Sequence, residues 1–248
     1  MITPELVHAA GLVGAVLLGA ALQRVTGVGF ALVAAPLLVV LLGPFDGVLV
    51  VNLLGTVTAS LIFLRVRREV EYKRVLWLLA PALAATIPGA WVARHAHPAV
   101  LSLVIALLVL MALAGSLLVR RTRLFSGRGG ALAGGLTSGF MNVTAGVGGP
   151  AIAAYAVASR WPHPAFAASV QLYFMVLGAG SILAKFSFPV LESTQWIGML
   201  SGLVAGIVIG DCLARWIPAI AARRAAIVLA VAGALAVLAK GVLDWPGQ

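Results

Sequence analysis

The stretch Asn142-Val143-Thr144-Ala145-Gly146-Val147-Gly148-Gly149-Pro150 interrupts an apolar run that extends from about residue 130 to residue 159. Its glycines and its proline make an uninterrupted helix costly, so the sequence predicts a helix break here. In a chain this apolar, the break is expected inside a bilayer, where lipid cannot hydrogen-bond the backbone amides that it frees. Those amides must face protein or a wet cavity, an arrangement that is typical of a transport site.

Composition places the whole chain in the membrane class. Of its 248 residues, 62% are hydrophobic and 10% are charged, and the mean hydropathy is +1.11. Such values indicate an integral membrane protein whose short loops leave no room for a soluble domain. The net charge of +10 comes from basic residues between the apolar segments, which favours a role in membrane topology over nucleic-acid binding. The N-terminal stretch lacks a basic leader and is expected to be the first membrane segment.

Apolar segments fall into two similar sets, so we expect an all-α polytopic protein. In the first set, two short runs at 8–23 and 30–42 flank a weaker glycine break, and three runs of spanning length follow. In the second set, the broken pair around residues 142–150 is again followed by three such runs. The expected spans are residues 47–64, 75–93, 99–119, 165–184, 194–210 and 224–239.

A shift of 119 residues relates the two sets. It carries Trp77 onto Trp196 and brings amide or glycine residues together at four other places. We therefore predict an internal repeat, with residues 1–125 as the first half and residues 126–248 as the second. The other matched pairs are Gln23 with Asn142, Gly27 with Gly146, Gly29 with Gly148, and Asn52 with Gln171.

Lysine and arginine predict that the halves are inverted. The loops 65–74, 120–128 and 215–224 are rich in these residues and are expected in the cytoplasm, together with Arg160. Equivalent loops of the two halves then lie on opposite sides of the membrane, and both termini lie outside. Inverted repeats are common in secondary transporters, whose substrate site lies near the midplane where discontinuous helices meet. The broken pairs could either re-enter or span fully.

The sequence gives little support for catalysis or metal binding. Every aspartate, glutamate and histidine falls in a loop or at the end of a segment. His95 and His97 lack a third nearby ligand, and Cys212 is the single cysteine, so neither a metal site nor a disulfide is expected. We expect no cofactor and no enzymatic activity.

Neutral polar groups at the two breaks favour an anion. Helices that restart after Gly29 and Gly149 present unpaired backbone N–H groups and the positive end of the helix dipole. Hydroxyl and amide side chains nearby could add donors, although such side chains also serve simply to join neighbouring helices. The candidate substrate-binding residues are Gln23, Arg24, Thr26, Gly27, Gly29, Asn52, Ser138, Asn142, Thr144, Gly146, Gly148, Gly149 and Gln171.

Two features have alternative interpretations. Arg24 is a deep cation for an oxyanion if the first pair is a re-entrant hairpin with its tip at mid-depth, and a cytoplasmic loop residue if both segments span. A four-residue ladder of glycines is a helix-packing face, and it could also be the contact of a homodimer. The ladder consists of Gly198, Gly202, Gly206 and Gly210.

The glycine patterns resemble a known family. Residues 27–36, Gly-Val-Gly-Phe-Ala-Leu-Val-Ala-Ala-Pro, and residues 134–142, leading to Gly146-Val147-Gly148-Gly149-Pro150, are similar to the sulfite exporter TauE/SafE family. The resemblance implies a transporter of the bacterial inner membrane that moves sulfite or a small organosulfur anion. Phe30-Ala31 stands where many members carry further glycines, which makes the first break less open. The competing hypotheses are a non-transporting subunit of a larger complex and a channel for an uncharged solute.

Overall fold

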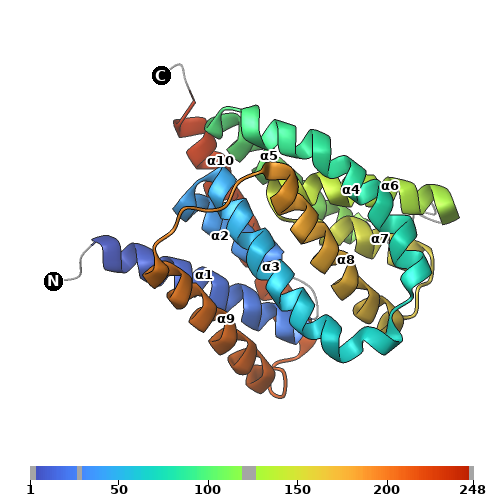
Figure 1. Ribbon diagram of the computed structural model, residues 1–248. Coiled ribbons are helices and arrows are strands. Elements are labelled where there is room, and N and C mark those ends of the chain that lie inside the picture. The colour runs from blue at the N-terminus through green and yellow to red at the C-terminus, as the bar shows by residue number, and fades with distance from the viewer. Residues whose placement is uncertain (1–3, 27–29, 119–126, 246–248) are drawn as a thin grey trace. The chain divides into compact units, whose positions relative to one another are not determined.

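The structure, a computed structural model, describes residues 4–26, 30–118 and 127–245, and these residues form ten α-helices, one 3₁₀ turn and no strand (Figure 1). Seven of these helices are long and apolar enough to cross a bilayer. The expected all-α polytopic membrane fold is confirmed. The helices are α1 (Pro4–Thr26), α2 (Phe30–Leu42), α3 (Pro44–Val66), α4 (Tyr72–His95), α5 (Pro98–Leu118), α6 (Gly127–Ala145), α7 (Gly149–Ala158), α8 (His163–Lys185), α9 (Ser193–Leu213) and α10 (Ala219–Leu243), with the turn η1 (Arg67–Glu69).

Each broken pair joins one long helix to one short helix. α1 has 23 residues and is about 34 Å long at the standard rise, so the expectation that it is too short to span is wrong. The helix extends beyond the apolar run at both ends and includes the polar residues Glu5 in its first turn and Arg24 in its last turn. α2 and α7, with 13 and 10 residues, are short as expected.

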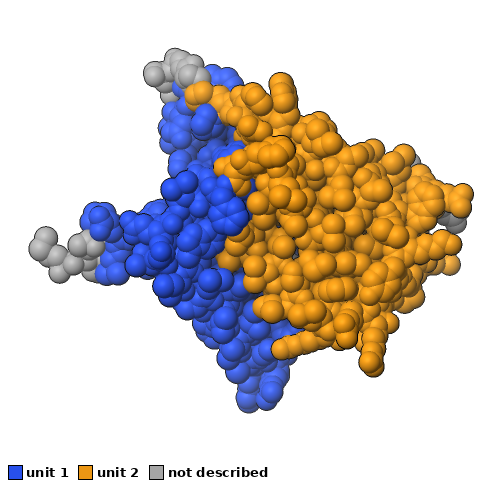
Figure 2. All heavy atoms as spheres, viewed as in Figure 1, with its two compact units in different colours: residues 1–51, 98–109, 188–248 blue, residues 52–97, 110–187 orange. Residues whose placement is uncertain are grey.

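The helices group into two compact units, which Figure 2 colours separately. Unit 1 comprises residues 1–51, 98–109 and 188–248, and unit 2 comprises residues 52–97 and 110–187. Neither unit is one half of the sequence, because each takes helices from both halves.

Unit 2 contains the parallel helices α4, α6 and α8. Gly135 of α6 lies against the Leu78 carbonyl of α4, and Gly139 lies against the Ala82 carbonyl. Residue numbers thus increase in the same direction along both helices, so α4 and α6 are parallel. α8 runs in the same direction, since Ser169 near its start binds the residue before α4 at 2.9 Å. The first turns of α4, α6 and α8 therefore lie at the same end of the unit.

In unit 1, α1 and α9 form a parallel pair. Gly202 lies against Val13, and Gly206 lies against the carbonyl of Leu17. Small residues in membrane helices allow this close backbone approach. The glycine ladder is therefore a packing face within the chain. Since α1 occupies it, the homodimer contact considered for this face is wrong.

Helix boundaries also agree with the 119-residue shift, which carries Pro44–Val66 onto His163–Lys185. The same shift carries the end of α1 onto the end of α6 and the start of α2 onto the start of α7. In unit 1 the contacts of Gly233 with Pro36 and of Lys240 with Val40 make α2 and α10 parallel. Within each unit the even-numbered helices named above are thus parallel, as expected if successive helices of the chain run in opposite directions. Each half contains five helices, and five is an odd number, so each helix of the second half would run opposite to its equivalent in the first half. We therefore propose an inverted repeat.

Positive charge gathers at one end of each unit. In unit 1, Arg24 ends α1, and Arg215 follows the end of the parallel helix α9. In unit 2, the basic residues lie at the end of α3, at the starts of α4 and α6, and after α7. We call this the cationic end of unit 2; it consists of Arg65, Arg67, Arg68, Lys73, Arg74, Arg128 and Arg160.

Candidate anion-binding site

The second helix break is shorter than its sequence motif. α6 continues through Thr144 and ends at Ala145, and α7 begins at Gly149, so only residues 146–148 are non-helical. Gly146 has a φ of 73°, and its N–H donates to the Asn142 carbonyl at 2.9 Å. This is the left-handed C-cap that glycine favours, because it has no Cβ to clash.

The break is buried and held against α6. The Ser138 hydroxyl donates to the Gly148 carbonyl at 2.8 Å. A Cβ at Gly148 would come within 2.7 Å of the Ser138 Oγ, so glycine permits this approach. No side chain caps the N-terminus of α7, and its second residue is Pro150. The positive end of its dipole therefore lies next to the buried N-cap residue Gly148 and has no side-chain cap.

We expect Gly146→Ala to destabilise the protein by about 1–2 kcal/mol, because an alanine Cβ disfavours the left-handed backbone. Thermal unfolding of the purified protein measures the change. Gly115→Ala is the matched control, since Gly115 is helical and has nothing within 4 Å of an added Cβ. A melting temperature that falls equally in both variants would contradict the assigned cap.

Two asparagines from different helices meet beside the break. The Asn142 amide donates to Asn52 Oδ1 at 2.9 Å and to Ser181 Oγ at 3.0 Å. Asn52 in turn donates to the Asn142 carbonyl at 3.1 Å. Both asparagines are only 4% exposed. The cluster therefore ties α3, α6 and α8 of unit 2 together at the point where α6 ends.

A buried stripe along α8 passes this cluster. Ser169, Tyr173, Ser181 and Lys185 lie four or eight residues apart, and each is 0–1% exposed. Each four-residue step turns by about 40°, so this stripe winds gradually around α8. The Tyr173 ring lies near the Ser138 side chain. Ser169 to Lys185 spans about 24 Å at the standard rise. Polar groups therefore follow α8 from the start of α4 to the break and beyond it.

Lys185 is the residue that sequence reasoning missed. Its position in the sequence suggested an external loop, but it ends α8 and is 1% exposed. It lies one turn beyond Ser181 on the same helical face, and Ser181 binds Asn142. The four-residue spacing of the stripe was the signal that could have found it.

Two predicted residues of unit 2 point elsewhere. Gln171 is half-buried, and its amide donates to the Ala167 carbonyl of its own helix at 3.3 Å. It lies two residues before Tyr173, nearly on the opposite side of α8. Thr144 is buried but donates to the Phe140 carbonyl at 2.6 Å. Neither side chain joins the asparagine cluster through these bonds.

The first break is described only in part. Gly27 and Gly29 lie outside the described residues, while Gln23, Arg24 and Thr26 form the last turn of α1 in unit 1. The Thr26 hydroxyl donates to the Leu22 carbonyl of its own helix at 2.7 Å, and Gln23 is half-buried.

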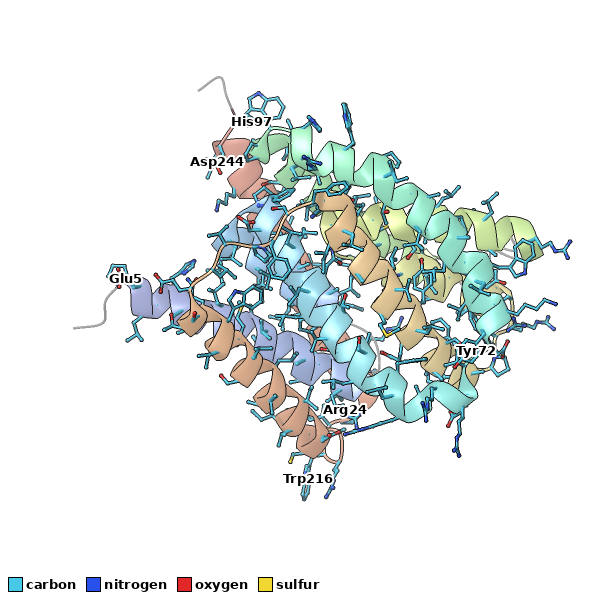
Figure 3. The ribbon with its side chains drawn as sticks, in the orientation of Figure 1. Glu5, Arg24, Tyr72, His97, Trp216 and Asp244 are labelled. Carbon is cyan, nitrogen blue, oxygen red and sulfur yellow. The ribbon has the colours of Figure 1, made fainter. Side chains whose placement is uncertain are left out.

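Arg24 forms an ion pair with Asp211 at the end of α9. Their side chains are 49% and 50% exposed, and Figure 3 shows Arg24 near Trp216, which follows α9. Arg24 therefore lies in the last turn of a 23-residue helix and is paired with an acidic residue, which favours its interpretation as a loop-end residue over that of a deep cation for the substrate.

The sequence matches the family described as sulfite exporter TauE/SafE over residues 12–237. The chain belongs to the TauE/SafE family. The match covers both glycine breaks and confirms the resemblance seen in the sequence. Together with the apolar helices, membership makes the chain a multi-pass membrane protein of a transporter family for sulfur-containing anions. No curated protein and no solved structure matches the chain.

Proposed function

We propose that this TauE/SafE protein is a secondary transporter that carries sulfite, a sulfonate or a similar small sulfur-containing anion across the bacterial cytoplasmic membrane. The substrate binds at the break between α6 and α7. The observation that carries the proposal is the uncapped start of α7, which follows the buried residues 146–148 beside the Asn52–Asn142–Ser181 cluster. We use the name anion pocket for residues 146–149 together with this cluster.

Backbone and side-chain donors suit an oxyanion at this place. The first N–H groups of α7 and the dipole behind them favour negative charge without adding a fixed cation. Gly148 and Gly149 allow a ligand to approach the backbone closely. Asparagine and serine side chains can exchange their mutual hydrogen bonds for bonds to the oxygens of the anion. Such a neutral pocket binds an anion and still releases it.

Lys185 lies outside this neutral pocket, one helical turn beyond Ser181, and we propose that its positive charge adds to the attraction for the anion. Charged side chains within membrane helices are rare and are often found on substrate pathways, which supports this role for Lys185. The polar stripe of α8 then forms one wall of the route between the anion pocket and the cationic end of unit 2.

Topology completes the proposal. Following the positive-inside preference, the basic loops 65–74, 120–128 and 215–224 face the cytoplasm. The N- and C-termini then lie outside. The cationic ends also attract the anionic substrate toward the cytoplasmic mouth of the route.

Purified protein in vesicles loaded with sulfite or a sulfonate tests the function. We expect anion flux that follows the anion gradient and saturates, while empty vesicles remain tight. Absence of flux from a folded protein for every sulfur anion tried would favour the non-transporting subunit. Flux of an uncharged solute that is indifferent to membrane potential and to added anions would favour the channel.

The role of Lys185 has its own test. We expect Lys185→Met to weaken apparent substrate affinity about tenfold or more, since a charge-assisted hydrogen bond contributes about 1.5–3 kcal/mol. Lys185→Arg keeps the charge and should retain most of the affinity. Lys240→Met is the matched control, because Lys240 also lies in the last turn of a long helix, where it donates to the Val40 carbonyl. Equal affinities for Lys185→Met and Lys240→Met would remove Lys185 from the site.

A further inference from the structure

A groove lies between the first turns of α4 and α6, away from the anion pocket. Its volume is about 520 Å³. Its lining is mostly apolar, with one cation from each helix at the rim. The lining residues are Lys73, Leu76, Trp77, Ala80, Pro81, Arg128, Gly129 and Leu132.

Positive charge at the groove has several sources and no acidic counterpart in its lining. Lys73 and Arg128 lie in the first turns of two parallel helices, so the positive ends of two helix dipoles add to their charges. The Arg128 guanidinium lies over the Trp77 ring, 5.4 Å from its centre. A ligand for this end of the groove must be an anion.

Below the cations the groove becomes apolar. Leu76, Trp77 and Leu132 are 64%, 52% and 54% exposed, which is high for such large apolar side chains. In a membrane protein these surfaces face acyl chains. The groove therefore joins a cationic rim to walls that suit hydrocarbon, which is a combination that a free inorganic anion would not use.

Tryptophans on α4 place the groove at the level of lipid headgroups. Trp77 and Trp91 are both exposed and lie fourteen residues apart, within about 40° of each other around the helix. Their separation along the axis is about 21 Å, and tryptophan is enriched at both membrane interfaces. Lys73 and Arg128 then lie at the interface of the leaflet that faces the cationic end.

We propose that this groove binds one anionic phospholipid, with the headgroup phosphate between Lys73 and Arg128 and the acyl chains along Leu76 and Leu132. Basic pockets between membrane helices on the cytoplasmic side recognise such headgroups. A second hollow of about 490 Å³ shares Lys73 and Trp77 and adds Glu71, Tyr72 and Arg74, which gives room for a polar headgroup. Glu71 forms an ion pair with Arg74 at 3.4 Å, so this pair adds no net charge and Lys73 remains to face the phosphate. The proposal does not depend on which anion the protein transports.

The test measures binding of lipid to the purified full-length chain in detergent. We expect phosphatidylglycerol to raise the melting temperature more than phosphatidylcholine, and to remain bound in native mass spectrometry. Lys73→Gln and Arg128→Gln should each lower affinity for phosphatidylglycerol about fivefold, the usual effect of one basic residue at a charged membrane surface.

Arg94→Gln is the matched control for Arg128→Gln. Arg94 also lies over an aromatic ring, that of Phe186 at 5.9 Å, but near the opposite end of α4. This variant should keep the preference for phosphatidylglycerol. Equal stabilisation by both lipids, an undiminished preference in Arg128→Gln, or an equal effect of inorganic phosphate alone would each overturn the proposal.

Discussion

Replacing Asn142 with leucine is expected to reduce transport at least tenfold while the protein still reaches the membrane. Leucine has a similar size but removes both donors, those to Asn52 and to Ser181. It also places an apolar group beside the proposed anion, and a buried hydrogen bond that is lost leaves its partner unsatisfied at about 1–3 kcal/mol. The initial rate of sulfur-anion uptake into vesicles, corrected for the amount of folded protein, measures the effect.

Gln171→Leu is the matched control, because it makes the same change from amide to hydrocarbon. Gln171 lies on α8, on a different face from Ser181, which binds Asn142. Its amide bonds only within its own helix in the contacts that the structure describes. We expect near-normal transport. Should Asn142→Leu not fold, Asn52→Leu tests the same cluster from α3. Normal transport in a folded Asn142→Leu or Asn52→Leu variant would place the substrate elsewhere.

Glycine-to-alanine changes should have opposite signs at two helical positions of unit 2. At Gly139 an added Cβ would overlap the Ala82 carbonyl oxygen, so α4 and α6 would have to separate. We expect Gly139→Ala to destabilise the protein by about 1–3 kcal/mol or more. Gly55 has nothing within 4 Å of an added Cβ, and Gly55→Ala should stabilise by up to about 1 kcal/mol through its higher helix propensity.

Thermal unfolding in one detergent, with the two variants side by side, checks both signs. A fall for Gly139→Ala and a small rise for Gly55→Ala would support the close α4–α6 contact. If Gly139→Ala melts at the temperature of the unchanged protein, the two backbones are not in contact at this position.

Local sequence signals predicted the elements well. Gly146 to Pro150 marked the second break because glycine and proline act on the backbone of their own residues. Leu42 ended a short helix, and the apolar runs that follow became spanning helices of nearly the expected extent. What depended on contacts distant in sequence could not be read in this way. Arg24 looked like a lone cation, since its partner Asp211 is 187 positions away.

The site was predicted in part for the same reason. Ser138, Asn142 and the glycines are close in sequence and are brought together, and Asn52 joins them from α3. Gln171 was matched to Asn52 by the 119-residue shift, but equivalent positions in a repeat need not share a role. Lys185 was overlooked because charge suggested a loop, whereas burial depends on the helices packed around it.

Unit 1 combines helices from both ends of the chain, and this has a consequence for biosynthesis. α1 leaves the ribosome long before α9, its packing partner. At about 5–20 residues per second the wait is roughly ten to forty seconds. During that time the surface of α1 that will pack on the glycines of α9 is in contact with lipid or with the insertion machinery. Truncated chains that stop before residue 193 would therefore leave uncovered the surface of α1 that packs on the glycines of α9, and quality-control proteases would be expected to remove them.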